Sequence, residues 1–355
     1  MFLHGIFPPI TTPFYPDGNV YHKKLESNVE HYSRTPAAGI VVLGSTGEAI
    51  LLSDQERRDV LKTALAAAAP NKVMVAGTGI ESAHETLKLT EYAAELGYDA
   101  AMVRTPHYYK KQMLPANILA FYRTVADRSP LPVVIYNFPQ ATGYDIPAEL
   151  VIELAGHPNI VAIKESSGNL DKVKKMVEGT RHVKRQTAVT ETFDAVTLRM
   201  LKAAAADTSN GGQLVSVEAL AGTSKPSSSA VTAVGKLKTR QKEVGFQVMV
   251  GAAHQLEASL ALGAVGAIVA FASPAPMACY EIYAALKEGD TALALEKQER
   301  VKLAAQRVVG DFGVPGVKYS MELNGYYGGP SRLPFLPLTA DQKSEIEKLM
   351  AGIKS

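Results

Sequence analysis

Strand-like and helix-like segments alternate along almost the whole chain of 355 residues, and this alternation limits the folds that the chain can adopt. Short runs of Val, Ile and Ala bounded by turn residues are typical of strands buried on both faces of a parallel sheet. A helical pattern of apolar residues follows each run. Eight such pairs predict an α/β protein, a (β/α)8 barrel of the TIM type. The expected strands are 5–14, 39–43, 73–76, 100–103, 132–136, 160–164, 248–251 and 264–271.

Two regions depart from the barrel pattern. About 80 positions separate Lys164 from Phe246, many more than one helix and its turns require. We therefore expect a long insertion between the sixth helix and the seventh strand, at about 182–245. Within it, 192–206 could form a helix, and the Ser-, Thr- and Gly-rich stretch 207–242 is expected to be partly disordered. The predicted domains are the interrupted barrel, 1–289, and a C-terminal helical extension, 290–355.

Composition excludes several classes of protein. The formal net charge of +2 gives no reason to expect a nucleic-acid or anionic-membrane partner. No run of 18 apolar residues is present, so no transmembrane helix is expected. A single cysteine, Cys279, excludes an internal disulfide framework and suits a reducing compartment. The N-terminal segment has no cationic leader, and we expect a cytoplasmic protein.

A lysine ends the sixth expected strand. The apolar run 160–163 leads directly into Lys164. An ammonium group at the end of a buried strand is poorly solvated, and desolvation lowers its pKa towards neutrality. A neutral lysine amine is a nucleophile towards carbonyl carbon. Most lysines at strand ends simply reach solvent, so the neighbouring strand ends decide between the two interpretations.

Polar groups follow several other strands, and in a (β/α)8 barrel these ends share one face. The loop 44–48 carries two hydroxyl groups and backbone N–H groups that could hold a carboxylate. A phenol and a further hydroxyl end the fifth and sixth strands. Each feature alone has an ordinary structural explanation. Together they are the equipment for imine chemistry on a 2-oxo acid. The residues are Ser45, Thr46, His107, Tyr108, Tyr109, Tyr136, Lys164, Ser166 and Gly251.

At these residues the chain resembles the dihydrodipicolinate synthase / N-acetylneuraminate lyase family of pyruvate-dependent class I aldolases. The motifs that carry the resemblance are Gly44-Ser-Thr-Gly-Glu48, Tyr136-Asn-Phe-Pro139 with Thr142-Gly143, and Ile163-Lys164-Glu165-Ser166. The spacing from Tyr136 to Lys164 also fits. The similarity covers 1–180 and 246–355 and leaves the insertion outside it.

The resemblance implies a role for each residue. Lys164 is expected to form the Schiff base and Tyr136 to transfer protons. Ser45 and Tyr108 are expected to complete a proton relay, with Tyr108 reaching into a neighbouring subunit's site and Tyr109 as the alternative. The residues expected to contact substrate are Thr46, Ser166, Gly251 and Ile268.

Within the family, three segments look most like 4-hydroxy-2-oxoglutarate aldolase: 105–109, 312–316 and 325–330. The prediction is therefore a lyase that cleaves 4-hydroxy-2-oxoglutarate to pyruvate and glyoxylate. Synthesis of dihydrodipicolinate and cleavage of 2-keto-3-deoxy-sugar acids stay open. The synthases usually carry an arginine where this chain has Ala141, and the aldolase carries Asn where it has Thr46.

A non-catalytic sensor of 2-oxo acids is the alternative from another class. The Tyr136–Lys164 pair speaks against it, because ligand binding alone does not require a proton-transferring phenol. The resemblance implies no metal or organic cofactor, since the imine itself polarises the substrate, and the eight histidines are scattered. The expected partners are a small 2-oxo acid and further copies of the chain, in a homodimer or homotetramer.

Overall fold

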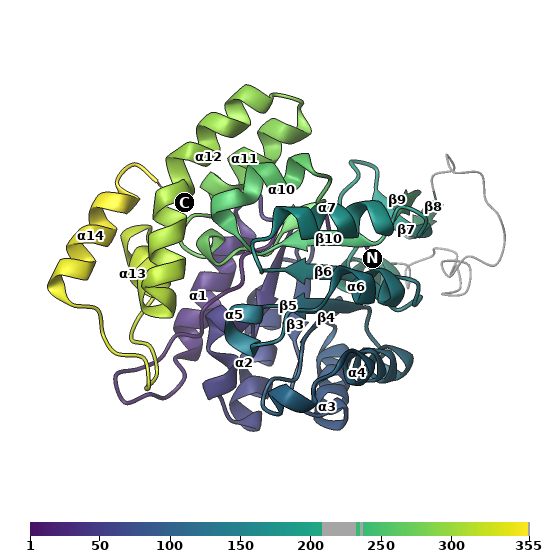
Figure 1. The fold of residues 1–355 in the computed structure, drawn as a ribbon, viewed down its shortest axis with the longest axis horizontal. Coiled ribbons are helices and arrows are strands. Elements are labelled where there is room, and N and C mark those ends of the chain that lie inside the picture. Colours follow the sequence, from purple (N-terminus) through teal and green to yellow (C-terminus); the bar gives the residue numbers. More distant parts are fainter. Residues whose placement is uncertain (208–231, 235–236, 354–355) are drawn as a thin grey trace.

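The computed structural model describes residues 1–207, 232–234 and 237–353, and its centre is a closed barrel of parallel strands (Figure 1). Eight described strands are hydrogen-bonded in the order β1-β11-β10-β6-β5-β4-β3-β2. A parallel bridge between Pro9 and Val41 joins the two ends of this series. The strands are β1 (Gly5–Ile6), β2 (Gly39–Val42), β3 (Val73–Gly77), β4 (Ala100–Arg104), β5 (Val133–Asn137), β6 (Ile160–Glu165), β10 (Gln247–Val250) and β11 (Gly266–Ala267).

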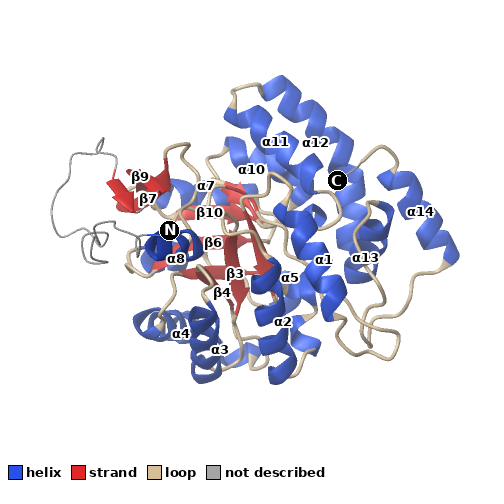
Figure 2. Ribbon diagram, turned by 180° about the vertical axis from the view of Figure 1, so that it is seen from behind, coloured by secondary structure: helices blue, strands red, loops and turns tan. Residues whose placement is uncertain are grey.

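Helices surround the strands in both views (Figures 1 and 2), so the predicted (β/α)8 barrel is confirmed. Side-chain caps mark the starts of two of these helices: Ser53 and Glu56 form a capping box at α2, and Ser82 caps α3. The helices are α1 (His22–Ser33), α2 (Asp54–Ala67), α3 (Ala83–Leu96), α4 (Pro115–Arg128), the short α5 (Pro139–Thr142), α6 (Ala148–Ala155), α7 (Leu170–Gly179), α10 (Leu256–Ala261) and α11 (Pro276–Lys287).

Strand register decides which side chains meet inside the barrel. The register pairs Tyr136 of β5 with Lys164 of β6, and Arg104 of β4 with Tyr136. Alternate residues of a strand point to the same face. Tyr136 lies in one buried cluster with Met102, Val134 and other inward-facing side chains. Tyr136 and Lys164 are therefore neighbours at the carboxyl ends of adjacent strands.

The first and last barrel strands are shorter than predicted. Strand β1 has two residues rather than ten, because the prolines at positions 8, 9 and 13 have no N–H group to donate to a ladder. Strand β11 also has two residues, and a 3₁₀ turn, Ala270–Ala272, replaces its predicted end.

The insertion contains a small sheet that the sequence analysis missed. Strands β7 (Arg185–Thr190), β9 (Leu237–Val244) and β8 (Thr232–Val234) form an antiparallel sheet in the order β7-β9-β8. Within the stretch expected to be partly disordered, 232–234 and 237–242 are strands, and 208–231 and 235–236 lie outside the described residues. The many polar residues of β9 hid a strand whose ladder with β7 spans six residue pairs.

One helix of the insertion, α8 (Leu198–Asp207), begins six residues later than predicted and docks on the barrel. The N–H group of Leu198 donates to Oδ1 of Asp99 at 2.8 Å. Arg199 donates to the carbonyl oxygens of Ala68 and Lys72. The insertion is thus tied to the loops that precede β3 and β4, at the end of the barrel opposite to Lys164.

The predicted C-terminal helical extension contains three described helices, α12 (Thr291–Ala305), α13 (Gly313–Leu323) and α14 (Ala340–Met350). A π-helical turn, Gln306–Asp311, joins the first two. Thr339 and Gln342 form a capping box at the start of α14. Figures 1 and 2 show these helices on the side of the barrel away from the insertion.

Candidate active site at the carboxyl ends of the strands

Lys164 is enclosed by the barrel wall. The residue is 5% exposed, and burial lowers the pKa of its amine from 10.5 to about 7. Its Nζ atom lies 4.1 Å from the centroid of the Tyr136 ring. Among the described residues, no carboxylate forms an ion pair with Lys164. Since no acidic partner offsets desolvation, a large fraction of the amine is neutral near pH 7.

Tyr136 links Lys164 to the loop after β2. Its hydroxyl group lies 3.3 Å from Oγ of Ser45, within hydrogen-bond distance. Burial raises the pKa of Tyr136 to about 12, although the hydrogen bond from Ser45 acts in the opposite direction. The phenol is therefore protonated in the resting site and can donate a proton or pass one to Ser45. The structure thus brings together Lys164, Tyr136 and Ser45, three of the four predicted catalytic residues.

The loop after β2 is a tight turn. Ser45–Gly47 form a 3₁₀ turn, η1, in which Thr46 is buried. The turn ends at Glu48, a non-glycine residue in the left-handed conformation with φ of 54°. Thr12 supports the turn, since its hydroxyl donates to the carbonyl oxygen of Gly47 at 2.6 Å. The hydroxyl groups of Ser45 and Thr46 thus stand on a braced backbone.

Ser166 and Gly251 meet at the ends of β6 and β10. The Oγ atom of Ser166 is buried, and no described group forms a hydrogen bond with it. A Cβ atom on Gly251 would lie 1.9 Å from this oxygen, so only glycine fits at that position. An unpaired buried hydroxyl is costly unless a ligand uses it. Ile268, predicted to contact substrate, is buried in the same inward-facing cluster as Tyr136.

The structure does not bring Tyr108 to Lys164 within one chain. Tyr108 is 75% exposed, and its ring contacts only that of Tyr109 edge-on among the described aromatic side chains. Glu81 holds this loop, because its carboxylate accepts hydrogen bonds from the N–H groups of His107 and Tyr108. Sequence reasoning missed Glu81, which lies in an unremarkable turn after β3. The relay role of Tyr108, or of Tyr109, stays a prediction.

A buried carboxylate next to Lys164 was also missed. Glu165 has a side chain that is 0% exposed, 3.2 Å from Nζ of Lys172. It accepts hydrogen bonds from Nδ2 of Asn137 and from the N–H group of Ser167. Asn137 and Glu165 each follow a predicted catalytic residue and point to the other side of their strands. The sequence signal that could have identified Asn137 and Glu165 is a polar residue at a strand position where the pattern predicts burial.

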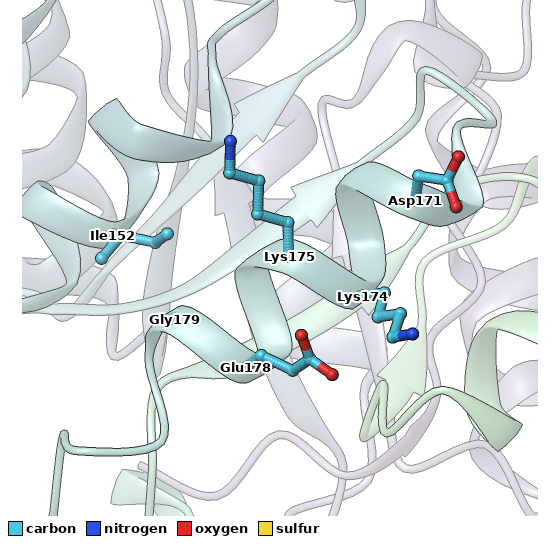
Figure 3. Close-up of a pocket in the computed structure, with 6 residues that line it drawn as sticks. All are labelled: Ile152, Asp171, Lys174, Lys175, Glu178 and Gly179. Carbon is cyan, nitrogen blue, oxygen red and sulfur yellow. The ribbon is translucent and has the colours of Figure 1, made fainter.

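Other hollows and clusters in the described residues lie away from this site. An open hollow on the outer face of α6 and α7 is lined by Ile152, Asp171, Lys174, Lys175, Glu178 and Gly179 (Figure 3). The side chains labelled there splay apart rather than converge. Across the described part of the chain, no three His, Cys, Asp or Glu residues gather as metal ligands would. None of the described helices is long and apolar enough to cross a membrane.

Comparison with known proteins decides the family. The sequence profile of the dihydrodipicolinate synthetase family matches residues 2–211 and 210–353, which is nearly the whole chain. The chain belongs to the dihydrodipicolinate synthetase family. With the family comes the class of reaction, and the protein is a carbon–carbon lyase of the Schiff-base type, as predicted.

Several relatives of this dihydrodipicolinate synthetase family member carry one name. The 4-hydroxy-tetrahydrodipicolinate synthase of Methanothrix thermoacetophila is 29% identical over 346 residues, which cover 98% of this chain and 95% of the relative. That of Methanococcoides burtonii is 38% identical over 197 residues, 56% of this chain and 66% of the relative. The comparisons do not support the more specific prediction of a 4-hydroxy-2-oxoglutarate aldolase, and the synthase alternative fits them better.

Solved structures share the fold. Dihydrodipicolinate synthase from Bacillus anthracis superposes with a TM-score of 0.78 at 22% identity, covering 99% of each chain. A prophage protein of the dihydrodipicolinic acid synthase family from E. coli K12, solved in complex with pyruvate, gives 0.75 at 24% identity, again over 99% of each chain.

Proposed function

We propose that the protein joins pyruvate to an aldehyde through an imine on Lys164, and that it is a 4-hydroxy-tetrahydrodipicolinate synthase. The observation that carries the proposal is a buried amine, with a pKa of about 7, against the ring of a phenol that is hydrogen-bonded to Ser45. The name shared by the relatives supports the choice of product.

The chemistry follows from these groups. Neutral Lys164 adds to the C2 carbonyl of pyruvate, and the carbinolamine loses water to give a protonated imine. Tyr136 protonates the hydroxyl group that leaves as water, and its phenolate then takes a proton from C3, because the imine nitrogen withdraws electrons; an enamine forms. The enamine carbon attacks the aldehyde carbon, and the new alkoxide takes a proton from Tyr136. The amino group of the joined aldehyde then displaces Lys164 from the imine carbon, which closes the ring of the product, returns a proton to Tyr136 and restores the free amine.

Each remaining residue has a task in this scheme. The hydroxyl groups of Ser45 and Thr46, with the N–H groups of their turn, hold the pyruvate carboxylate. The unpaired hydroxyl of Ser166 donates to the same ligand. Ser45 also returns a proton to Tyr136 across their 3.3 Å contact. Tyr108 completes the relay from a second copy of the chain, in which case the working unit is at least a dimer.

A second candidate is cleavage of a 4-hydroxy-2-oxo acid to pyruvate and an aldehyde, the reverse use of the same steps. Ala141 favours it, because the arginine that usually holds the second substrate's carboxylate in the synthases is missing here. Ala141 lies exposed in α5, directly after the strand that carries Tyr136.

Borohydride reduction in the presence of pyruvate tests the shared part of both candidates. We expect one reduced pyruvyl group, located at Lys164 by mass spectrometry of peptides. No label, or a label on another lysine, would overturn the proposal. Product analysis then separates the candidates: one assay supplies pyruvate with the amino-aldehyde that yields 4-hydroxy-tetrahydrodipicolinate, and the other supplies 4-hydroxy-2-oxoglutarate and measures release of pyruvate.

A further inference from the structure

A second buried lysine lies on the C-terminal extension, far in sequence from the barrel motifs. Lys318 of α13 is 1% exposed at its side chain, and its Nζ atom lies 2.6 Å from Oε1 of Glu48, which is 0% exposed. The same ammonium group donates to the carbonyl oxygens of Thr12 at 2.9 Å and Pro330 at 2.8 Å. Two carbonyl oxygens thus accept hydrogen bonds from the ammonium group, and the carboxylate of Glu48 forms an ion pair with it.

Glu48 belongs to the turn that carries Ser45 and Thr46. Its second carboxylate oxygen accepts a hydrogen bond from the N–H group of Arg332 at 2.8 Å. Lys318 and Arg332, both on the C-terminal extension, thus hold the two oxygens of one buried carboxylate. Among the described residues, no group forms a hydrogen bond with Oε1, so the ion pair with Lys318 is what compensates the charge there.

The backbone of this turn needs such support. Three described non-glycine residues have a positive φ, and two of them, Leu43 at 62° and Glu48 at 54°, bracket the turn. Left-handed residues other than glycine cost free energy and persist only where their surroundings hold them. The side chain of Arg332 adds a second clamp, because it donates to Glu56 and to the carbonyl oxygen of Leu51 beyond the turn.

Lys318 also contacts Thr12, the residue that supports the turn. Thr12 accepts a hydrogen bond from Lys318 through its carbonyl oxygen, and its hydroxyl donates to the carbonyl oxygen of Gly47 at 2.6 Å. Lys318 is therefore connected twice to the end of the turn that follows Ser45 and Thr46, directly through Glu48 and through Thr12 to Gly47. The same turn carries the hydroxyl group of Ser45, which lies 3.3 Å from that of Tyr136.

We infer that Lys318 and Glu48 are positioning residues: the C-terminal extension holds the turn 44–48 in the geometry that binds the carboxylate of the 2-oxo acid. The inference rests on the proposed function, since it assigns that carboxylate to this turn. It makes the extension part of the catalytic unit. The buried ion pair then determines how tightly pyruvate is held, while the reactivity of Lys164 is set separately by its own burial.

The test measures imine formation as a function of pyruvate concentration in the full-length protein, by borohydride trapping and intact mass. In Lys318→Met we expect the half-saturating pyruvate concentration to rise by about tenfold or more, because an unpaired carboxylate in the turn disturbs its geometry. The midpoint of the pH dependence of trapping at saturating pyruvate should stay where it is in the wild type. In Arg307→Gln, a control that breaks the Arg307–Glu345 pair on the same extension, half-saturation should not change.

A double variant separates positioning from folding. Glu48→Gln with Lys318→Met buries no unpaired charge, so its thermal stability should recover relative to Lys318→Met, while half-saturation stays at least threefold above the wild type. If half-saturation in both variants lies within twofold of the wild type, the inference is overturned. If Lys318→Met does not fold, the double variant decides alone. Absence of trapping in the wild type would instead remove the proposed function, and the inference with it.

Discussion

Two buried lysines, in two regions of the molecule, differ in the groups that surround them, and the comparison shows how the surroundings of a lysine determine its role. Lys164 at the end of β6 and Lys318 in α13 are both nearly inaccessible to water. Lys318 meets a carboxylate and two carbonyl oxygens, whereas Lys164 meets the face of an aromatic ring. Burial of an ammonium group is costly in both places and lowers the pKa of both amines, but at Lys318 the carboxylate of Glu48 offsets part of that cost.

The difference lies in the strand and helix that carry each lysine. At Lys164 the neighbouring carboxylate, Glu165, is next in sequence and therefore points to the opposite face of β6, where Asn137 and Lys172 bind it. Strand alternation thus separates this acid from the amine that must stay neutral. At Lys318 the fold brings an acid directly to the amine. The absence of an acidic partner leaves the amine of Lys164 reactive, whereas the ion pair between Lys318 and Glu48 makes the surrounding backbone rigid.

The largest effect should come from Lys164→Met. Without the amine no imine forms, and turnover should fall by about 10⁴-fold or more, the scale on which loss of a nucleophile acts. Pyruvate-dependent borohydride labelling and product formation measure the two losses. Retained turnover in this variant would remove Lys164 from the reaction and end the comparison between the two lysines.

Tyr136→Phe should keep the imine and lose catalysis. Removing one acid–base group lowers the rate by roughly 10²–10⁴. The ring that faces Lys164 is retained in Phe, so labelling at Lys164 should continue. Trapping and steady-state rates on the same preparation distinguish this result from misfolding. An unchanged kcat would show that the phenol takes no part in proton transfer.

Stability should respond in opposite directions at the two lysines. Lys318→Met leaves Glu48 buried without its partner and should lower the free energy of unfolding by about 3–5 kcal/mol. Lys164→Met removes an uncompensated amine and should raise the same quantity. Urea unfolding of both variants beside the wild type measures the two changes. Stabilisation of both variants would contradict the contrast drawn here.

The pH dependence should report Lys164 alone. Its amine deprotonates at about 7 when folded and at 10.5 in the unfolded chain, so imine formation should increase between pH 6 and 8. Below pH 7 both states are protonated, and the native state bears the full cost of the buried charge. Between pH 7 and 10.5 the unfolded state binds more protons, so stability rises with pH.

The stability gain of Lys164→Met should accordingly be larger at pH 6 than at pH 9, by on the order of 2 kcal/mol. Urea unfolding at the two pH values gives this difference. An equal gain at both would mean that the amine has an ordinary pKa. Arg307→Gln, measured in parallel, controls for general effects of pH on the fold.

The smallest effect should come from Ala141→Arg. Ala141 is exposed, so the substitution should leave the free energy of unfolding within about 0.5 kcal/mol of the wild type. A guanidinium group there should lower KM for a carboxylate-bearing aldehyde by about tenfold through a charge-assisted contact. Imine formation with pyruvate alone should not change. An unchanged KM would show that another group already holds the second carboxylate.

Prediction from the sequence succeeded where the signals are local. Buried runs of Val and Ile located six of the barrel strands closely, and the side-chain caps at the starts of α2, α3 and α14 are local features of the same kind. The insertion was less accessible, because the ladder between β7 and β9 joins segments about 50 residues apart and the strands are largely polar. The contact that holds the Tyr108 loop could not be predicted either, since it comes from Glu81, 27 positions away.

The sequence by itself determined that Lys164 and Tyr136 end neighbouring buried strands, because strand alternation and apolar runs are local properties of the chain. Only the tertiary structure decided which charged groups are buried together. Arg332 and Glu48 are 284 positions apart, and Lys318 and Glu48 are nearly as far apart. Lys318 lies in a helix and Glu48 in a turn, and the sequence alone would place both charges in solvent. Burial of both partners arises only when the extension packs on the barrel, because segments so far apart in the chain meet only in the folded protein.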